Sequence, residues 1–383
     1  VNAYTSELLN RSDLIIDAML GTGITSSVRD NFAKIINEIN TSNKPVLSID
    51  VPSGISSDTG QPLGIAIQAS KTITFVGIKQ GLTTTIGKQH CGELIFDDLN
   101  IGPAFFELAT SSGTLINIKS FKKLGARNLN SHKGTHGKLL CVGGNEGTAG
   151  AIRLSSEAAL RAGAGIVKVY THSSSVVPVS IGRPELMVTS TNLKEALEWA
   201  SCVVIGPGLG LNEWAQKTFE EVIYYCQTNN MPLVIDADAL NLLSKQASSY
   251  TLKQCVLTPH PGEASRLLSK TIVDVESNRF ENARLCAKRY NATCVLKGAG
   301  TLIDNAENTW VCEDGNAALA VGGSGDVLTG IIGALLAQGL NIDEAARYGV
   351  TLHAKAGDIA SVREGERGML PSDLFKIVRS LIN

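Results

Sequence analysis

The chain of 383 residues exceeds the roughly 250–300 residues at which a single hydrophobic core stops growing, so we expect two domains. Hydrophobic residues make up 43% and charged residues 18%, which excludes a disordered chain. The formal net charge of −2 disfavours nucleic acid as a partner, and the apolar stretches are too short to cross a membrane.

Eight cysteines lie scattered without CxxC pairs or neighbouring histidines, a pattern that indicates buried thiols. We therefore expect a soluble protein of a reducing compartment, the cytoplasm. The first residues, VNAYTSELLN, have neither an initiator Met nor the pattern of a signal peptide. We expect that the sequence starts inside a longer protein.

Strand-like runs at 14–18, 46–51, 72–76 and 94–97 surround a helix-like segment at 29–40, which predicts a parallel α/β sheet. Residues 107–137 are rich in Ser, Thr, Gly, Lys and Asn, so a boundary is expected there. We predict a first domain over 1–108, a linker over 109–123 and a second domain over 124–383.

The second domain alternates six apolar strand-like runs, from KLLCVGG to CVLKGAG, with helical patterns at 149–162, 193–200, 214–225 and 275–290. Such strands predict a central sheet with helices on both faces. TLIDN and TWVCEDG predict an antiparallel hairpin. Helices are expected at 326–338, 343–364 and 371–382.

GGSGD, which ends at Asp326, precedes an apolar helix. Convergent backbone N–H groups and a helix N-terminus form an anion hole for phosphate, and the carboxylate could accept a proton from an attacking hydroxyl. The alternative is a helix start whose first acidic residue complements the helix dipole. We favour the catalytic interpretation.

Three other loops follow predicted strands. KGAGT, from Lys297, could meet nucleotide phosphate or form a tight turn with a solvated lysine. In TPHPGE, two prolines position His260, which could contact a substrate or be structural. GPGLG could let a flat ligand ring approach the backbone.

Asp236 and Asp238 of VIDADALNLL could face a metal, although capping of the next helix is the safer interpretation. HKGTHG, over 132–137, could be a phosphate or substrate loop but does not suit zinc.

In the first domain, IIDAMLGTGITSS places Asp17 and two glycines, and IDVPSG places Asp50 and one glycine, at a strand end, which suggests a dinucleotide crevice. GTGITS is only a fragment of the GxGxxG fingerprint. No GxxxxGK[ST] segment is present, so a P-loop mechanism is excluded.

GPGLG, VIDADALNLL, LTPHPGE, KGAGT and NAALAVGGSGDVLTG, in this order, resemble the NAD(P)H-hydrate dehydratase family of the ribokinase superfamily. DAMLGTG and SIDVPSGI resemble the NAD(P)H-hydrate epimerase domain that is fused to this dehydratase in bifunctional repair enzymes. The resemblance implies an α/β protein: a ribokinase-like three-layer αβα domain preceded by a partial Rossmann-like αβα domain.

The resemblance also implies site residues. The catalytic base would be Asp326. Nucleotide would bind Lys297, Gly298, Ala299, Gly300, Thr301, Asn316, Ala317, Ala318, Leu319, Ala320, Val321, Gly322, Gly323, Ser324 and Gly325. Hydrated dinucleotide would bind Asp326, Gly210, His260, Pro261, Gly262, Glu263, Ala264, Ser265 and Arg266. In the epimerase domain it would bind Gly21, Thr22, Gly23, Ile24, Thr25, Ser26, Ser27 and Asp50. Potassium would bind Asp17 and Ser53.

The implied activity is nicotinamide-nucleotide repair. A lyase reaction would dehydrate the S epimer of hydrated NADH or NADPH with ADP and Mg²⁺, and release AMP and phosphate. An isomerase reaction would interconvert the epimers, but the family's Asn- and Gly-rich loop before these motifs is absent, so we expect no epimerase activity from this chain. The sequence is also compatible with assembly of this chain into a homo-oligomer.

Two rivals remain at this stage. A vitamin or sugar kinase of the same superfamily would need the same anion hole and base. A non-catalytic nucleotide-binding module ranks lower because Asp326 is present.

Overall fold

A computed structural model of the chain describes residues 4–246 and 251–383. The chain divides into two compact units, with the main boundary between Thr114 and Leu115, and Gly298–Gly300 group with the first unit. Strand β5 (Thr114–Ile116), which lies in the predicted linker, pairs at the edge of the second unit's sheet. Each unit is described by itself.

The first unit contains a four-stranded sheet in the order β1-β2-β3-β4, and all of its strands are parallel. The strands are β1 (Ile15–Asp17), β2 (Val46–Ile49), β3 (Lys71–Phe75) and β4 (Glu93–Asp97). The helices are α1 (Ser6–Arg11), α2 (Asp30–Thr41), α3 (Thr85–Cys91) and α4 (Pro103–Leu108). Ile36 and Ile39 lie on one face of α2 and pack with Val46 of β2, as their helical spacing predicts. The predicted parallel α/β sheet is confirmed.

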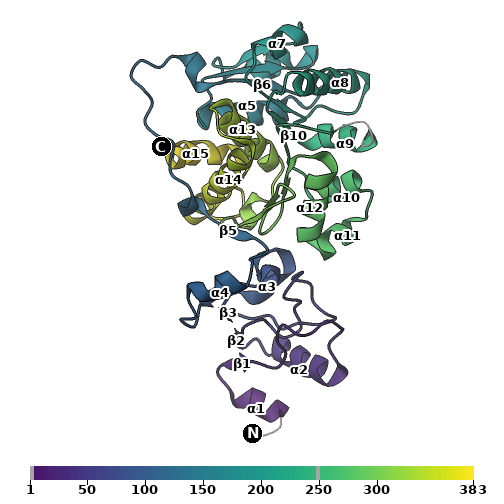
Figure 1. Cartoon of the computed structure of the whole chain (residues 1–383), viewed down its shortest axis with the longest axis vertical. Helices are drawn as coiled ribbons and strands as arrows, with labels where there is room; N and C mark the ends of the chain where they lie inside the picture. The colour runs from purple at the N-terminus through teal and green to yellow at the C-terminus, as the bar shows by residue number, and fades with distance from the viewer. Residues whose placement is uncertain (1–3, 247–250) are drawn as a thin grey trace. The chain divides into compact units, whose positions relative to one another are not determined.

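The second unit is built on a ten-stranded sheet in the order β5-β14-β13-β12-β11-β10-β9-β6-β7-β8. Strands β5, β6 and β10 of this sheet are labelled in Figure 1. Its further strands are β6 (Lys138–Val142), β7 (Ile166–Tyr170), β8 (Met187–Thr189), β9 (Cys202–Ile205), β10 (Leu233–Ile235), β11 (Cys255–Leu257), β12 (Thr293–Leu296), β13 (Leu302–Asp304) and β14 (Thr309–Cys312). Strands β6 to β12 pair in parallel, whereas β13 pairs antiparallel with both β12 and β14. The predicted hairpin is therefore confirmed. Strand β8 had not been predicted.

Helices cover both faces of this sheet. The first layer comprises α5 (Ala149–Arg161), α13 (Ser324–Ala337), α14 (Ile342–Glu364) and α15 (Leu374–Ile382). The second comprises α7 (Leu193–Trp199), α8 (Glu213–Thr228), α9 (Ala237–Lys245), α10 (Pro261–Leu268), α11 (Ile272–Ser277) and α12 (Arg279–Tyr290). The short α6 (Val176–Ser180) precedes β8. In β6, Leu139 joins the first core and Leu140 the second. Because alternate side chains enter different cores, both must be apolar.

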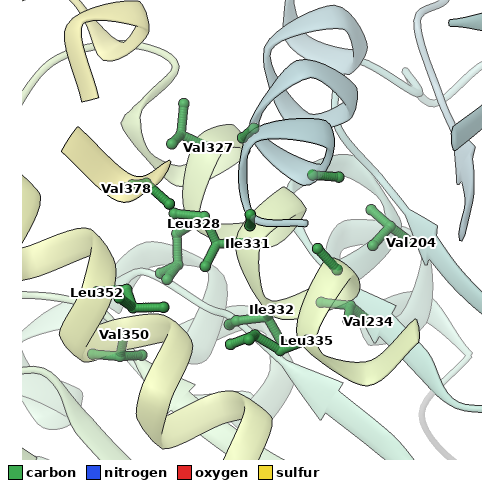
Figure 2. Close-up of a cluster of buried hydrophobic side chains, with 14 of the residues drawn as sticks. Val204, Val234, Val327, Leu328, Ile331, Ile332, Leu335, Val350, Leu352 and Val378 are labelled. Carbon is green, nitrogen blue, oxygen red and sulfur yellow. The ribbon is translucent and has the colours of Figure 1, made fainter. Parts of the chain in front are cut away.

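Helix α13 packs on the sheet between its neighbours α5 and α14. Its apolar side chains, among them Val327 and Ile332, pack between Val204 and Val234 of the sheet and Leu352 of α14 (Figure 2). Gly330 allows a close approach to α5, because a Cβ there would lie 2.0 Å from the backbone oxygen of Ser155. Gly333 allows a close approach to β9, because a Cβ at this position would lie 2.4 Å from the side chain of Val204.

We expect Gly330→Ala to destabilise the second unit by about 1–3 kcal/mol, the usual cost of overpacking. The methyl group must displace α13 from α5, and this outweighs the better helix propensity of alanine, about 1 kcal/mol. The free energy of unfolding in urea measures the change. Gly150→Ala, in the first turn of α5, is the matched control because a Cβ there meets nothing within 4 Å. Equal stability of both variants would contradict the close approach.

Several predicted helices have different bounds; the one expected at 371–382 begins as a 3-10 turn over Pro371–Asp373 and is α-helical from Leu374. The predicted helix at 275–290 is two helices, α11 and α12, because Asn278 has a non-helical backbone and its side chain accepts a hydrogen bond from the backbone N–H of Glu281. The predicted helix at 326–338 begins earlier, at Ser324, which places Asp326 in its first turn. Among the described residues, no helix combines the length and the apolar character that crossing a membrane requires.

Candidate active site

Three charged side chains from separate segments meet at the carboxyl edge of the second unit's sheet. Asp236 follows β10, Lys297 follows β12, and Asp326 lies at the start of α13. The Lys297 ammonium nitrogen lies 2.9 Å from Oδ1 of Asp236 and 3.7 Å from Oε2 of Glu263 in α10. Parallel strands present their carboxyl ends at one edge, which is where open α/β sheets bind ligands.

Asp326 has an unusually high proton affinity. Burial raises its pKa to about 7, the negative charge of Asp236 adds to this effect, and Lys297 opposes it. A carboxyl group with a pKa near neutrality can accept a proton at physiological pH and release it again. The structure therefore gives Asp326 the property that a general base needs.

The start of α13 can bind an anion. Gly323 precedes the helix with φ +91°, a conformation that suits glycine, and the helix N-terminus adds partial positive charge. The Ser324 hydroxyl lies 3.1 Å from Nε2 of His353, which is buried in α14. Burial lowers the pKa of His353 to about 4, so its ring stays neutral and adds no charge.

Lys297 retains its proton. Burial alone would lower the pKa of its ammonium group, but Asp236 and Glu263 raise it, and the net shift is upward. The buried Arg279 of α12 donates hydrogen bonds of 3.1 Å to the backbone oxygens of Leu296 and Lys297. This arginine fixes the end of β12, and with it the position from which the lysine side chain starts.

The TPHPGE segment forms the start of α10 as a capping box. The backbone N–H of Gly262 donates to Nδ1 of His260 at 2.9 Å, and the backbone N–H of His260 donates to Glu263 at 2.8 Å. The His260 side chain remains 52% exposed, and its Nε2 lies 3.5 Å from Oε1 of Glu263. Burial, followed by Lys297, lowers the pKa of His260.

The GPGLG loop lies against Asp236 and Asp238. A Cβ at Gly206 would lie 1.8 Å from the backbone oxygen of Asp236, and the Gly210 N–H donates to Asp238 at 2.8 Å. The capping interpretation of these aspartates is wrong. Asp236 occupies the N-cap position of α9 without a side-chain cap bond, since its oxygens bond Lys297 and Thr329 of α13.

The segment from Asn316 to Gly325 approaches α13 along α14. Asn316 accepts a hydrogen bond from the Ala318 N–H at 2.9 Å and donates to Asp358 of α14 at 2.8 Å. A short 3-10 turn covers Ala317–Leu319. The segment is thus held against α14 before it reaches Gly322 and Gly323.

A cavity of about 1350 Å³ lies at the opposite end of α13. Gln338, which follows the last residue of α13, lines it, together with Arg127, Arg379 and His136. Asp326 is in the first turn of the same helix, roughly 18 Å away at 1.5 Å per residue. HKGTHG, whose Thr135 and His136 line this cavity, is therefore separate from the charged cluster around Asp326.

In the first unit, Asp17 and Ser53 lie together. The Ser53 hydroxyl donates to Oδ1 of Asp17 at 2.5 Å, and the Ser53 N–H and Ser48 hydroxyl each donate to Oδ2 at 2.8 Å. Asp17 is 1% exposed. Oxygen ligands suit a hard cation, but both oxygens of Asp17 already accept protein hydrogen bonds. Among the described residues, no three His, Cys, Asp or Glu side chains are grouped so that they could hold a metal ion.

Asp50 lies at the end of β2 with φ +70° and forms an ion pair with Lys79. The Thr74 hydroxyl and the Phe75 N–H also donate to its Oδ1, each at 3.2 Å. Gly21 and Gly23, in the loop after β1, have nothing within 4 Å of a built Cβ, so this loop has room around it.

Comparisons with known proteins decide the family. Residues 139–380 match the model of NAD(P)H-hydrate dehydratase, and residues 2–81 match the YjeF-related protein N-terminus. The chain is 43% identical, over 97% of its length, to the bifunctional NAD(P)H-hydrate repair enzyme of Escherichia coli (strain K12), of which it covers 72%. It is 42% identical to that of Coxiella burnetii, over 99% of this chain and 78% of the relative. This chain belongs to the bifunctional NAD(P)H-hydrate repair enzyme family.

Solved structures confirm the family's fold in this chain. The ADP/ATP-dependent NAD(P)H-hydrate dehydratase of Bacillus subtilis, co-crystallised with ATP/Mg²⁺, aligns at a TM-score of 0.61 and 28% identity. The alignment covers 69% of this chain and 94% of that chain. A ribokinase-like superfamily protein from Enterococcus faecalis V583 aligns at 0.65 and 29%, over 72% and 96%. The expected ribokinase-like α/β fold is confirmed.

The motifs for this repair enzyme family pointed to Lys297, Glu263 and Asp326, and the structure brings these three together. Sequence reasoning gave no role to Thr329, His353, Arg279 or Lys79. Thr329 and His353 lie within apolar helices, where spacing predicts core positions. The ion pair between Lys79 and Asp50 was not predictable from the sequence, because it depends on the positive φ of Asp50 at the end of its strand.

Proposed function

We propose that this chain dehydrates hydrated NADH and NADPH, with ADP as the phosphoryl donor. The observation that carries the proposal is Asp326, a carboxyl group with a pKa near 7 beside Lys297 and the N-terminus of α13. A base, an ammonium group and an anion hole at one point are the groups that phosphoryl transfer to a hydroxyl requires. The names of the relatives, which are NAD(P)H-hydrate repair enzymes and a dehydratase, support the assignment of hydrated NADH and NADPH as substrates.

The reaction proceeds in two steps. Asp326 accepts the proton of the ring hydroxyl of the S hydrate while the hydroxyl oxygen bonds to the terminal phosphorus of ADP, and AMP leaves. The carbon–oxygen bond then breaks, phosphate leaves with the electron pair, and the neighbouring ring carbon loses a proton to solvent. The ring double bond is thereby restored. Backbone N–H groups at the start of α13 stabilise the phosphoryl charge in both steps.

Binding roles follow the same arrangement. Lys297 to Thr301 and Asn316 to Gly325 bind the nucleotide, whose phosphates bring Mg²⁺, and Gly210 with His260 to Arg266 binds the hydrate. Mg²⁺ supplies charge neutralisation of the phosphates when bound. In the first unit, Gly21 to Ser27 and Asp50 are assigned to hydrate binding, as the resemblance to the epimerase domain implies. Potassium at Asp17 and Ser53 stays a prediction, and no step depends on it. The domain limits, the cytoplasmic location and a homo-oligomer also remain predictions.

Product analysis tests the dehydratase against a small-molecule kinase of the same superfamily. Hydrated NADH, Mg²⁺ and ADP are incubated with the chain, and phosphate and nicotinamide absorbance are measured. Equal yields of phosphate and NADH support dehydration. A stable phosphoester without return of absorbance identifies a kinase. ATP in place of ADP shows which donor is used.

The rate should depend on pH through Asp326. A base must be deprotonated to act, so kcat/KM should fall as the pH drops below about 7, by about tenfold per pH unit. The profile is measured between pH 5 and 9, and the hydrate is assayed for spontaneous loss at each pH as a control. A rate that stays constant down to pH 5 would show that the proton acceptor is another group.

A further inference from the structure

Asp236 contacts two elements of the site rather than its own helix. Its side chain is buried at the end of β10, and each of its oxygens has a different partner. Oδ1 accepts from the Lys297 ammonium at 2.9 Å, and Oδ2 accepts from the Thr329 hydroxyl in α13 at 2.6 Å. An aspartate at an N-cap position normally accepts hydrogen bonds from the N–H groups of its helix. The Asp236 side chain makes no such bond, and instead connects the residue after β12 with α13.

The two partners are adjacent to the base. The built Cβ of Gly325, the residue before Asp326, would lie 3.3 Å from Lys297 Nζ and 3.9 Å from Asp236 Oδ2. Asp236 thus holds the ammonium group at the first turn of α13, next to the catalytic carboxylate. Without this hydrogen bond, the flexible lysine side chain could adopt other rotamers or pair with Glu263 alone.

We propose that Asp236 is a positioning residue: its two oxygens lock Lys297 and α13 together, so that the ammonium group and Asp326 face the same phosphoryl group. The proposal rests on the proposed dehydratase function. Asp236 itself does not touch the reacting atoms. It acts through Lys297 and through its charge.

The charges around Asp326 allow this role to be measured. Asp236, Asp238 of α9 and Glu263 of α10 raise the pKa of Asp326, Lys297 lowers it, and the neutral His353 faces the cluster from α14. Asp236→Asn removes one negative charge and also releases Lys297 to approach Asp326. Both changes lower the pKa of Asp326, so the direction of the shift is defined.

The test uses Asp236→Asn in the whole chain. Turnover with ADP should fall by about tenfold to a hundredfold, as expected when a charged group is misplaced by about 1 Å. The acid limb of kcat/KM should move about one unit to lower pH. Asp274→Asn is the matched control, since this exposed carboxylate caps α11 and lies outside the cluster. A rate loss with an unshifted acid limb would overturn the proposal.

A second measurement needs no substrate. The carboxyl carbon of Asp326 is followed by NMR titration of protein labelled with ¹³C at aspartate, with Asp326→Asn to assign the signal. A lower midpoint in Asp236→Asn supports the proposal even if the chain proves to be no dehydratase. An unchanged midpoint overturns it even if the wild-type chain dehydrates the hydrate.

Thr329 provides a variant that keeps every charge, should Asp236→Asn fail to fold. Thr329→Val removes the hydrogen bond to Asp236, so turnover should fall several-fold while the acid limb stays in place. Thr329→Ser restores the hydroxyl and should restore the rate. Turnover of Thr329→Val equal to that of the wild type would show that the hydrogen bond to Asp236 does not contribute.

Discussion

Replacing Asp326 by Asn should lower dehydratase turnover by about a hundredfold to ten-thousandfold, while ADP still binds. The amide is nearly isosteric with the carboxylate but cannot accept the hydroxyl proton. The substitution also removes a negative charge beside Lys297 and the phosphate site, so ADP affinity should be equal or higher. Turnover is measured by the return of nicotinamide absorbance and affinity by calorimetry.

The two readouts separate a lost base from a lost fold. A variant that neither binds ADP nor turns over has lost its site and says nothing about the base. Turnover close to that of the wild type, with normal ADP binding, would exclude Asp326 as the proton acceptor.

Replacing Lys297 by Met should destabilise the second unit by about 3–5 kcal/mol at pH 8, the usual cost of leaving a buried charge without its partner. Asp236 and Glu263, both buried, would face each other without the ammonium group. The loss should shrink at pH 6, because unpaired buried carboxylates take up protons more readily. Urea unfolding at both pH values measures it.

The double variant Lys297→Met with Asp236→Asn is the control for this interpretation. Because the second substitution removes one of the unpaired charges, the double variant should be more stable than Lys297→Met alone. If the two are equally destabilised, the lysine stabilises the unit through its aliphatic packing and not through its charge.

The sequence predicted most of the fold because alternation of apolar runs is a local signal. Residues such as Leu139 and Leu140, both apolar, indicate a strand buried on two faces before any partner strand is known. Strand β8, from Met187 to Thr189, escaped prediction because its residues are exposed or half-buried, whereas the equally short β10 and β11 are apolar and fully buried. The break at Asn278 was missed, although Asn followed three residues later by Glu281 is a recognisable capping signature.

The site was predictable as a set of loops but not as a network. Strand ends indicate which loops share an edge, and this placed Lys297 there. Asp326, which lies in the first turn of α13 rather than after a strand, was grouped with it through the motifs GGSGD and KGAGT. The choice between capping and ion pairing at Asp236 depends on Thr329, which lies 93 positions further along the chain. No local pattern contains that information, and burial decides it, since the buried carboxylate needs a partner on each oxygen.

The close packing of α13 against α5 has a consequence for synthesis of the protein. The ribosome completes α5 at Arg161 long before it reaches Ser324, the first residue of α13. At a synthesis rate of about 5–20 residues per second, roughly 8–30 s pass between completion of α5 and synthesis of α13, the helix that packs against it. During this time the apolar face is exposed on the nascent chain, and a transcript broken before α13 yields a product with a permanently uncovered core.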